Sequence, residues 1–401
     1  MNKIARAVPD DETVITLNFE LEKLINISEA KLLSAYKIGE NIPRFKWNSK
    51  DPDEANRLYT LRSDVFNGEN LLTNFEFLGQ YTNPSAGKFR DRIFVAVPLQ
   101  IVPSGVNLKP MDGSIQFRWF NSTRYSYATN DTYLGVYNEI EPLDQPVYGQ
   151  DPRMIIHNDT HIQLFFTSMS LGMKHQKMGV AELQYLEAEK RMSVTYVYQP
   201  ILLEHQKTSV QKNWSPFVHN GEVLLVQSIN PLTVVRLQGY GTTAVIAQLV
   251  SKDNFTHVNC LIGELRGGTN AIRLHDRYLA FYHQRTKLPW DFMTSYLFGA
   301  YSFTLDPPFR LLSISPAPIM PKRLYSGPWQ GRYIDYCVYP MHLSLEDAIS
   351  SPSSTSGRLR LSFGSQDKHG YVCEIDLITL LSTMIPVRSI DDDLNIKDDM
   401  E

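Results

Sequence analysis

The sequence is poor in cysteine, and its three cysteines show no pairing or metal-binding pattern. Cys260, Cys337 and Cys373 stand far apart in apolar, strand-like contexts, with no CxxC spacing. An odd and sparse count argues against a disulfide framework and is typical of a protein from a reducing compartment. No metal-ligand spacing of histidine or acidic residues stands out either. We therefore expect free, buried thiols and no metal site.

The sequence also lacks a long apolar run and an excess of positive charge. No stretch approaches the ~20 apolar residues of a membrane-spanning helix, and the first residues contain no signal-peptide core. With 39 Lys and Arg against 43 Asp and Glu, the formal net charge of −4 provides no basic field for nucleic acid. These absences predict a cytoplasmic protein that binds neither membranes nor nucleic acids.

What the sequence does contain is a recurring pair of short apolar segments. Each pair follows polar, glycine or proline residues, and the pairs occupy residues 154–168, 217–228, 271–284 and 342–367. Their spacing of roughly 60 residues is typical of propeller blades rather than of short solenoid repeats. In a propeller the corresponding ends of such units meet around one axis. The repeat therefore predicts an all-β propeller.

The ends of the chain differ from this repeat. Residues 1–80 contain the best helix candidate, 28–36, with Ser28 as its N-cap, and we expect them to form an N-terminal extension that packs on the propeller. Residues 81–388 are assigned to the propeller, with further strands expected at 92–97, 114–120, 192–198 and 295–305. Residues 181–190 fit either a short helix or a strand pair. The acidic tail, 389–401, is expected to be disordered.

One motif carries chemistry that a repeat does not need. Gly149-Gln150-Asp151-Pro152-Arg153 precedes the first hairpin. Because proline cannot donate to a strand ladder, Pro152 is predicted at the start of a strand, with Asp151 and Arg153 at the rim of the sheet. A turn aspartate paired with a surface arginine is the competing interpretation. The same layout recurs at Lys212-Asn213-Trp214-Ser215-Pro216, which favours a shared pocket.

Five segments in order resemble motifs of glycoside hydrolase family 130 and of the related trypanosomatid β-1,2-mannosyltransferases and phosphorylases. The segments are 149–153, 211–217, 267–283, 299–307 and the pair 338–340 with 363–367. They are similar to the family's Glu-Asp-Pro-Arg, Lys-Asn-Trp, Gly-rich turn with Tyr-His, Leu-Asp-x-Pro, and Val-Phe-Pro with Tyr-Gly-x-x-Asp. The resemblance implies a five-bladed β-propeller that acts on β-linked mannose, with β-1,2 linkages expected.

The resemblance also implies roles for single residues. Asp151 takes the place of the family's general acid, whose proton is proposed to pass through a sugar hydroxyl. A phosphate nucleophile needs fixed cations, and the resemblance assigns the anion-binding role to Lys212, His283, Arg118 and Arg153. It assigns sugar binding to Asn213, Trp214, Tyr282 and Asp367. No cofactor is implied, because inorganic phosphate or a sugar nucleotide such as GDP-mannose serves as the co-substrate.

Departures from the family keep other hypotheses open. Gln150 replaces the family's glutamate, and the arginines that its phosphorylases carry between the first two motifs have no match here. The same cations would serve phosphate or a sugar diphosphate. A hydrolase would need a second carboxylate ~6.5–9.5 Å from the first, for which Glu264 and Asp367 are candidates. A propeller that only binds glycans or proteins is the third hypothesis. Lys212, Trp214, His283 and Asp367 each also fit a purely structural role.

Overall fold

The structure is a computed structural model, and nearly all of its described elements are β-strands. It describes residues 71–79, 83–90, 92–98, 114–120, 139–141, 143–144, 147–168, 177–198, 200–202, 212–238, 245–253, 264–287, 294–315, 319, 337–346, 357–365 and 369–387. The helix expected at 28–36 and the tail expected at 389–401 lie outside these residues.

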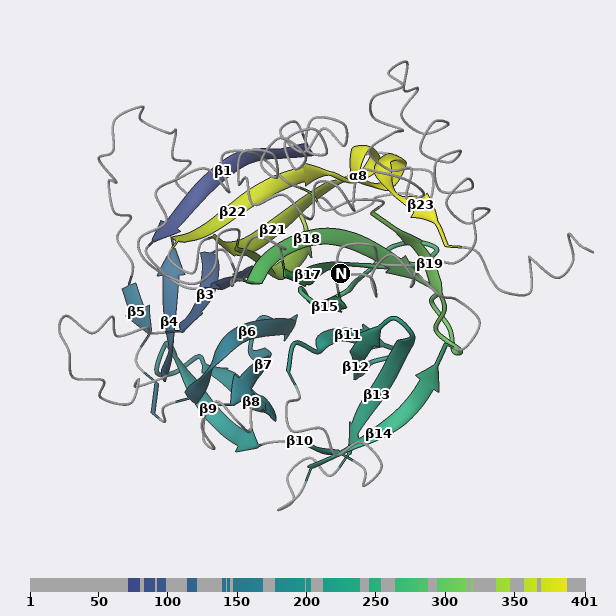
Figure 1. Ribbon diagram of the computed structural model, residues 1–401. Coiled ribbons are helices and arrows are strands. Elements are labelled where there is room, and N and C mark those ends of the chain that lie inside the picture. Colours follow the sequence, from purple (N-terminus) through teal and green to yellow (C-terminus); the bar gives the residue numbers. More distant parts are fainter. Residues whose placement is uncertain are drawn as a thin grey trace, which may run out of the picture.

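The strands form the five blades of a β-propeller (Figure 1). Blade 1 comprises β2 (Ser85–Phe89), β3 (Arg92–Pro98), β4 (Ser114–Phe120) and β5 (Glu139–Glu141). Blade 2 comprises β6 (Val147–Asn158), β7 (His161–Ser168), β8 (Lys177–Leu186) and β9 (Arg191–Tyr198). Blade 3 comprises β11 (Ser215–His219), β12 (Glu222–Ile229), β13 (Leu232–Gln238), β14 (Val245–Lys252) and β10 (Pro200–Leu202), which runs parallel to β14.

The last two blades are completed by strands from the two ends of the described chain. Blade 4 comprises β15 (Glu264–Gly267), β16 (Ile272–Arg273), β17 (Tyr278–Lys287), β18 (Thr294–Phe303), β19 (Leu311–Ile314) and β23 (Ile385–Pro386). Blade 5 comprises β20 (Val338–Leu345), β21 (Arg358–Ser365), β22 (His369–Asp376) and β1 (Leu72–Gly79). In sequence, α8 (Leu377–Thr383) lies between β22 and β23. Its N-cap Asp376 accepts a hydrogen bond from the main-chain N–H of Thr379.

Each blade has an inner strand that lies next to the propeller axis. In blade 4, β15 and β16 both pair with β17 on this side. These inner strands are β2, β6, β11, β16 and β20, and each contacts the next, with β20 returning to β2. In a closed ring of this kind every blade packs between two others, and only short, protected strand edges remain. The prediction of a five-bladed β-propeller is therefore confirmed, and the starts of the inner strands meet at one end of the ring.

The ring is closed by pairing between the ends of the propeller sequence. β1 pairs antiparallel with β22, from Leu72 opposite Ile375 to Gly79 opposite Gly370. The propeller thus begins with β1, and residues 72–79 are a strand of blade 5 rather than part of a separate extension. The predicted boundary at residue 80 missed this strand because its partner lies about 300 residues away in sequence, beyond the reach of a local pattern.

Alternating side chains fill both sides of each blade. In β17, Leu279 and Phe281 pack toward blade 5, whereas Tyr278, Ala280 and Tyr282 pack toward blade 3. Successive side chains of a strand point to opposite faces, so a strand buried on both faces needs a continuous apolar run. The described core has one such cluster at every junction between neighbouring blades.

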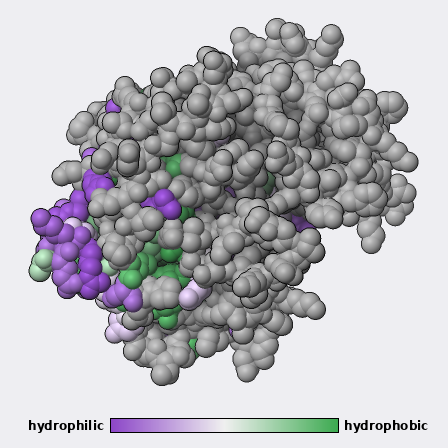
Figure 2. All heavy atoms as spheres, turned by 90° about the vertical axis from the view of Figure 1, so that its left-hand side faces the viewer, coloured by the Kyte–Doolittle hydropathy of each residue, from purple (hydrophilic) through white to green (hydrophobic). Residues whose placement is uncertain are grey.

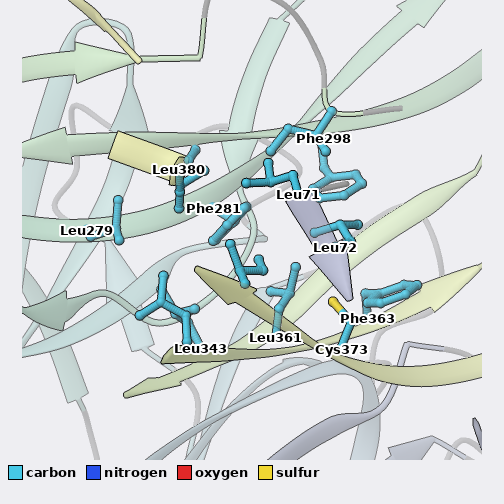
Figure 3. Close-up of a cluster of buried hydrophobic side chains, with 14 of the residues drawn as sticks. Leu71, Leu72, Leu279, Phe281, Phe298, Leu343, Leu361, Phe363, Cys373 and Leu380 are labelled. Carbon is cyan, nitrogen blue, oxygen red and sulfur yellow. The ribbon is translucent and has the colours of Figure 1, made fainter. Parts of the chain in front are cut away.

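The largest of these clusters lies between blades 4 and 5. Figure 3 shows Phe281 and Phe298 of blade 4 beside Leu361, Phe363 and Cys373 of blade 5, with residues of β1 and α8 covering them. Cys373 is buried, as is Cys337, which confirms the expected burial of these two cysteines. Cys260 lies outside the described residues.

Charged residues gather on the outer rim of the blades. In blade 2, the turn after β8 carries Glu187, which forms an ion pair with Arg90 of blade 1 at 2.5 Å. Figure 2, which views the side where β4 and β9 lie, shows hydrophilic residues collected at one edge beside hydrophobic ones. The described residues contain no helix long and apolar enough to cross a membrane.

The predicted strands agree closely with the observed ones. The segments expected at 92–97, 114–120, 192–198 and 295–305 correspond to β3, β4, β9 and β18. The ambiguous residues 181–190 continue β8 as far as Leu186 and then form the turn to β9. The structure therefore settles this segment as strand and turn.

Candidate active site

The Asp-Pro motif forms a bulge inside the inner strand of blade 2. β6 pairs with β7 on both sides of the motif, but its register shifts between Gln150 and Arg153. Asp151 adopts a left-handed backbone conformation with φ 51°, which aspartate tolerates better than most residues. Pro152 was predicted at the start of a strand, but it lies at this bulge instead. A bulge can hold a proline because it also leaves a residue outside the hydrogen-bond ladder. The bulge redirects the Asp151 side chain.

Asp151 is partly exposed, and one of its carboxylate oxygens is held by a residue of another blade. Asn83, two residues before β2, donates a hydrogen bond from Nδ2 to Oδ1 of Asp151 at 2.7 Å. Asn83 is itself buried and adopts a left-handed conformation with φ 46°. The sequence reasoning missed Asn83, although Asn83-Pro84 repeats the pattern of Asp151-Pro152.

Arg153 lies fully buried beneath Asp151 and ties three blades together. Its Nη1 donates to the main-chain oxygen of Asp151 at 2.9 Å, and its Nη2 donates to Asn213 Oδ1 and to the oxygen of Gly267, each at 3.2 Å. Its Nε donates to the oxygen of Gly268. Burial lowers the pKa of Arg153 to about 10, and the nearby Asp151 offsets part of that shift. The predicted anion-binding role is corrected, because these N–H groups are directed at protein acceptors.

Asn213 and Gly267 provide the other side of this network. Asn213 also adopts a left-handed conformation, φ 63°, and only 3% of it is exposed. A Cβ atom on Gly267 would lie 2.1 Å from the main-chain oxygen of Asn213, so only glycine fits there. The predicted sugar-binding role of Asn213 is corrected, because its side-chain oxygen accepts the hydrogen bond from the buried Arg153.

The residues next to this network bring cationic groups to the same place. Lys212 precedes Asn213 and Arg266 precedes Gly267, and both are partly exposed. Arg266 lies directly opposite His283 in the β15–β17 pair, so their side chains share one face of the sheet. Burial lowers the pKa of His283 well below its usual value, and the charges of Arg153, Arg266 and Lys212 lower it further. The imidazole is therefore neutral at pH 7.

Two tyrosine rings flank His283. The ring centroids of His283 and Tyr339 are 5.0 Å apart, those of Tyr296 and Tyr339 4.8 Å, and those of His283 and Tyr296 6.1 Å. His283 is buried, whereas both tyrosines are partly exposed. Neither nitrogen of the His283 ring has a hydrogen bond of good geometry among the described residues, and the main chain of Gly267 favours its protonated form only weakly. Partly exposed aromatic rings offer stacking faces for a sugar.

Two aromatic residues predicted to face the sugar lie in the core instead. Trp214 is 1% exposed and packs between blades 2 and 3. Tyr282 is 2% exposed and packs between blades 3 and 4, where its hydroxyl lies over Gly299. Both predictions are corrected. Tyr282 lies on β17 and Trp214 directly precedes β11, and each large ring fills a junction between blades.

The remaining predicted residues do not join this group in the described structure. Arg118 lies on β4, two strands outward from the inner strand β2, opposite Val95. Its predicted anion-binding role is corrected, because β4 is the third strand of blade 1 and not the strand beside the propeller axis. Asp367 lies outside the described residues. Glu264 begins β15 opposite Arg285, but the position of its carboxylate is not described.

The site is thus a group of converging polar residues around the bulge of β6. Asp151 supplies a partly exposed carboxylate, Lys212 and Arg266 are partly exposed cations that can contact an anion, and the neutral His283 lies buried near them. Among the described residues, no group of three or more His, Cys, Asp or Glu side chains is placed to hold a metal ion.

Comparison with known proteins finds similarity in structure but not in sequence. No family model matches the chain, and no curated protein matches it in sequence. A glycosyl hydrolase from Bacteroides ovatus superposes with a TM-score of 0.49 at 13% identity, over 80% of this chain and 92% of that one. A mannose phosphorylase from Leishmania mexicana, in complex with a phosphate ion, gives 0.42 at 10% identity, over 84% and 98%.

A third solved structure comes from the family whose motifs the sequence resembles. Its description states that the family 130 mannoside phosphorylases contain glycoside hydrolases that target β-1,2 mannosidic linkages in Candida mannan. It superposes with a TM-score of 0.46 at 12% identity, over 76% of this chain and 89% of that one.

Proposed function

We propose that this protein is a carbohydrate-active enzyme that cleaves or forms β-linked mannosides, with β-1,2 linkages preferred. The proposed reaction is inverting phosphorolysis, or transfer from a sugar nucleotide such as GDP-mannose, with Asp151 as the general acid or base. The ordered motifs at 149–153, 211–217 and 267–283 support the choice of mannosides.

One geometric observation carries the proposal. Arg153 binds the main chain of Asp151, the side chain of Asn213 and the main chain of Gly267. The sequence neighbours of the last two are Lys212 and Arg266. A single buried guanidinium therefore contacts the acidic residue and the sequence neighbours of both cationic residues. An acid and an anion site side by side are what phosphorolysis requires.

Each group has a defined part in the proposed reaction. A phosphate oxygen attacks the anomeric carbon from the face opposite the glycosidic bond, so that bond breaks with inversion. The proton of Asp151 passes to the leaving oxygen, and Asp151 ends as a carboxylate. Lys212 and Arg266 offset the charge of the phosphate and hold it in line. The neutral His283 accepts or donates one hydrogen bond to it without adding charge.

Two further functions, one enzymatic and one of binding alone, are distinct hypotheses. A hydrolase would use a second carboxylate to activate water, and Glu264 and Asp367 are still the candidates from the sequence. A glycan-binding propeller would bind mannosides without turnover. The proposal of phosphorolysis or transfer is favoured over simple binding because Asp151 stays partly exposed while the residues that support it are buried.

Product analysis with defined donors tests the proposal. Purified protein is incubated with β-1,2-mannobiose alone, with added phosphate, or with mannose and GDP-mannose, and the Asp151→Asn variant is treated in parallel. Phosphate-dependent release of mannose 1-phosphate, or synthesis of mannobiose from GDP-mannose with release of GDP, supports the proposal if the variant is inactive. Mannose release without phosphate identifies a hydrolase. Binding without any product identifies a lectin-like propeller and refutes the enzymatic proposal.

A further inference from the structure

The amide of Asn83 is one of the best-fixed groups near Asp151. Asn83 is 4% exposed, lies two residues before β2, and donates to Oδ1 of Asp151 at 2.7 Å. The two residues come from different blades, 68 positions apart in sequence. Both side chains in this contact are polar, so apolar packing does not explain why they meet.

Blade 5 holds Asn83 from the other side. A Cβ on Gly364 would lie 2.2 Å from Oδ1 of Asn83 and 2.6 Å from its main-chain nitrogen, so Asn83 rests directly on the glycine backbone. The next residue, Pro84, rests on Gly370 in the same way. Ala86 donates its main-chain N–H to Oγ of Ser362 at 3.0 Å. The Asn83 amide is therefore placed by the scaffold before any substrate binds.

We propose that Asn83 is a positioning residue that acts through Asp151, an inference that rests on the proposed function. Its Nδ2–H occupies Oδ1, which leaves Oδ2 as the oxygen that carries the transferred proton. When Asp151 gives up this proton, negative charge develops on the carboxylate, and a hydrogen bond to a charged acceptor is stronger than one to a neutral acceptor. The amide thus stabilises the transition state more than the bound substrate.

The Asn83→Gly variant removes the amide without straining the main chain. Glycine adopts positive φ values readily, so the backbone at φ 46° is retained. We expect kcat to fall about 10- to 100-fold, the range of a hydrogen bond to a charged group, with KM nearly unchanged. The alkaline limb of the kcat–pH profile should move to higher pH, because the ionised carboxylate loses a donor. A purely structural role would not move this limb.

Two further variants keep the test decisive. Asn83→Asp retains the shape against Gly364 but replaces the donor with a second carboxylate, so it should lower kcat and shift the same limb further. Asn220→Gly is the matched control, because Asn220 has φ 50° in an exposed hairpin turn, and it should leave kcat and the pH profile unchanged. If Asn83→Gly does not fold, Asn83→Asp decides.

The outcomes separate this inference from the proposed function. If the wild type turns over, Asp151→Asn is inactive and Asn83→Gly retains the wild-type kcat and pH profile, then the positioning role is refuted and the proposed function stands. If the wild type shows no turnover with any donor, both are refuted. A lower kcat with a shifted alkaline limb supports both.

Discussion

Asp151 in blade 2 and Asn213 in blade 3 belong to corresponding motifs of neighbouring blades, with Asp151 at the bulge inside β6 and Asn213 just before β11. Both adopt left-handed backbone conformations, φ 51° and φ 63°, and both are followed by buried strand residues. Their side chains differ in surroundings. Asp151 is partly exposed with one oxygen held by Asn83, whereas Asn213 is buried and accepts a hydrogen bond from Arg153. The same backbone feature thus presents a partly exposed carboxylate in blade 2 and a buried acceptor in blade 3.

The two positions are also connected. Arg153 donates to the main chain of Asp151 through Nη1 and to the side chain of Asn213 through Nη2. The place of the acidic residue therefore depends on a buried amide in the neighbouring blade. This connection predicts that changes at Asp151 act on turnover, while changes at Arg153 and Asn213 act first on stability.

The largest effect is expected for Asp151→Asn. Loss of a general acid lowers kcat by about 10²–10⁴-fold. Asparagine tolerates the left-handed conformation, so the free energy of unfolding should stay within about 0.5 kcal/mol of the wild type. Steady-state kinetics and urea denaturation measure the two quantities. Full turnover in this variant would remove Asp151 from the mechanism.

The next largest effect is expected for Arg153→Met, now in stability. The variant leaves the oxygens of Asp151, Asn213, Gly267 and Gly268 without their donor in a buried place. We expect the free energy of unfolding to fall by about 3–5 kcal/mol, as for other broken buried networks. Arg277→Met, which removes a partly exposed ion pair with Asp276, should cost less than about 1 kcal/mol. Equal losses in the two variants would contradict the role of Arg153.

The contact between blades 5 and 2 should be sensitive to acid, through His342 of β20 in blade 5. Burial lowers the pKa of His342 to about 4, and a hydrogen bond to the main chain of Met154 in β6 offsets this only in part. The unfolded state, with a histidine pKa of about 6.5, binds more protons below that pH. Stability from this group is therefore fully present above pH 6.5 and is lost as the pH falls toward 4, by up to about 3 kcal/mol.

The pH dependence of His342→Gln tests this expectation. Urea denaturation at pH 7 and pH 4.5 should show a smaller loss of stability on acidification than in the wild type. His275→Gln, at an exposed position, should keep the wild-type dependence. An unchanged slope in His342→Gln would show that the Met154 contact does not respond to protonation.

The smallest effect is expected for Asn213→Gly, which keeps the left-handed backbone and removes the acceptor for Arg153. We expect a loss of about 1–3 kcal/mol, the cost of one unsatisfied buried group. Asn220→Gly has the same change in backbone entropy at an exposed turn, and the difference between the two variants isolates the hydrogen bond. If Asn213→Gly loses turnover but no stability, then Asn213 belongs with Asp151 rather than with the scaffold.

The sequence was sufficient for the architecture because the blade signal is local. Hairpins such as Phe217–Ser228, with Asn220-Gly221 at the turn, can be recognised without knowledge of the rest of the chain. The strand that closes the ring could not, because β1 finds its partner β22 at the far end of the sequence. The role of Asn83 could not be predicted either, because its partner Asp151 lies 68 residues away in sequence.

The roles of single residues depended on which face of a strand they occupy. Tyr282 alternates with Phe281 and His283, so His283 shares a face with Phe281, toward blade 5 and Tyr339, while Tyr282 faces blade 3. The two-residue period could have separated these roles. The buried position of Arg153 could not be read from the sequence, because its acceptors are mostly main-chain oxygens of a distant segment.

A crystal structure with mannose and inorganic phosphate bound would show whether Asp151 and the cationic residues share one site. We expect the phosphate against Lys212 and Arg266, with His283 beside it, and the anomeric carbon between the phosphate and Asp151. A hydroxyl of the sugar should lie within hydrogen-bond distance of the carboxylate, about 2.6–3.2 Å. Binding of phosphate and mannose elsewhere on the propeller, with Asp151 contacting neither, would contradict it.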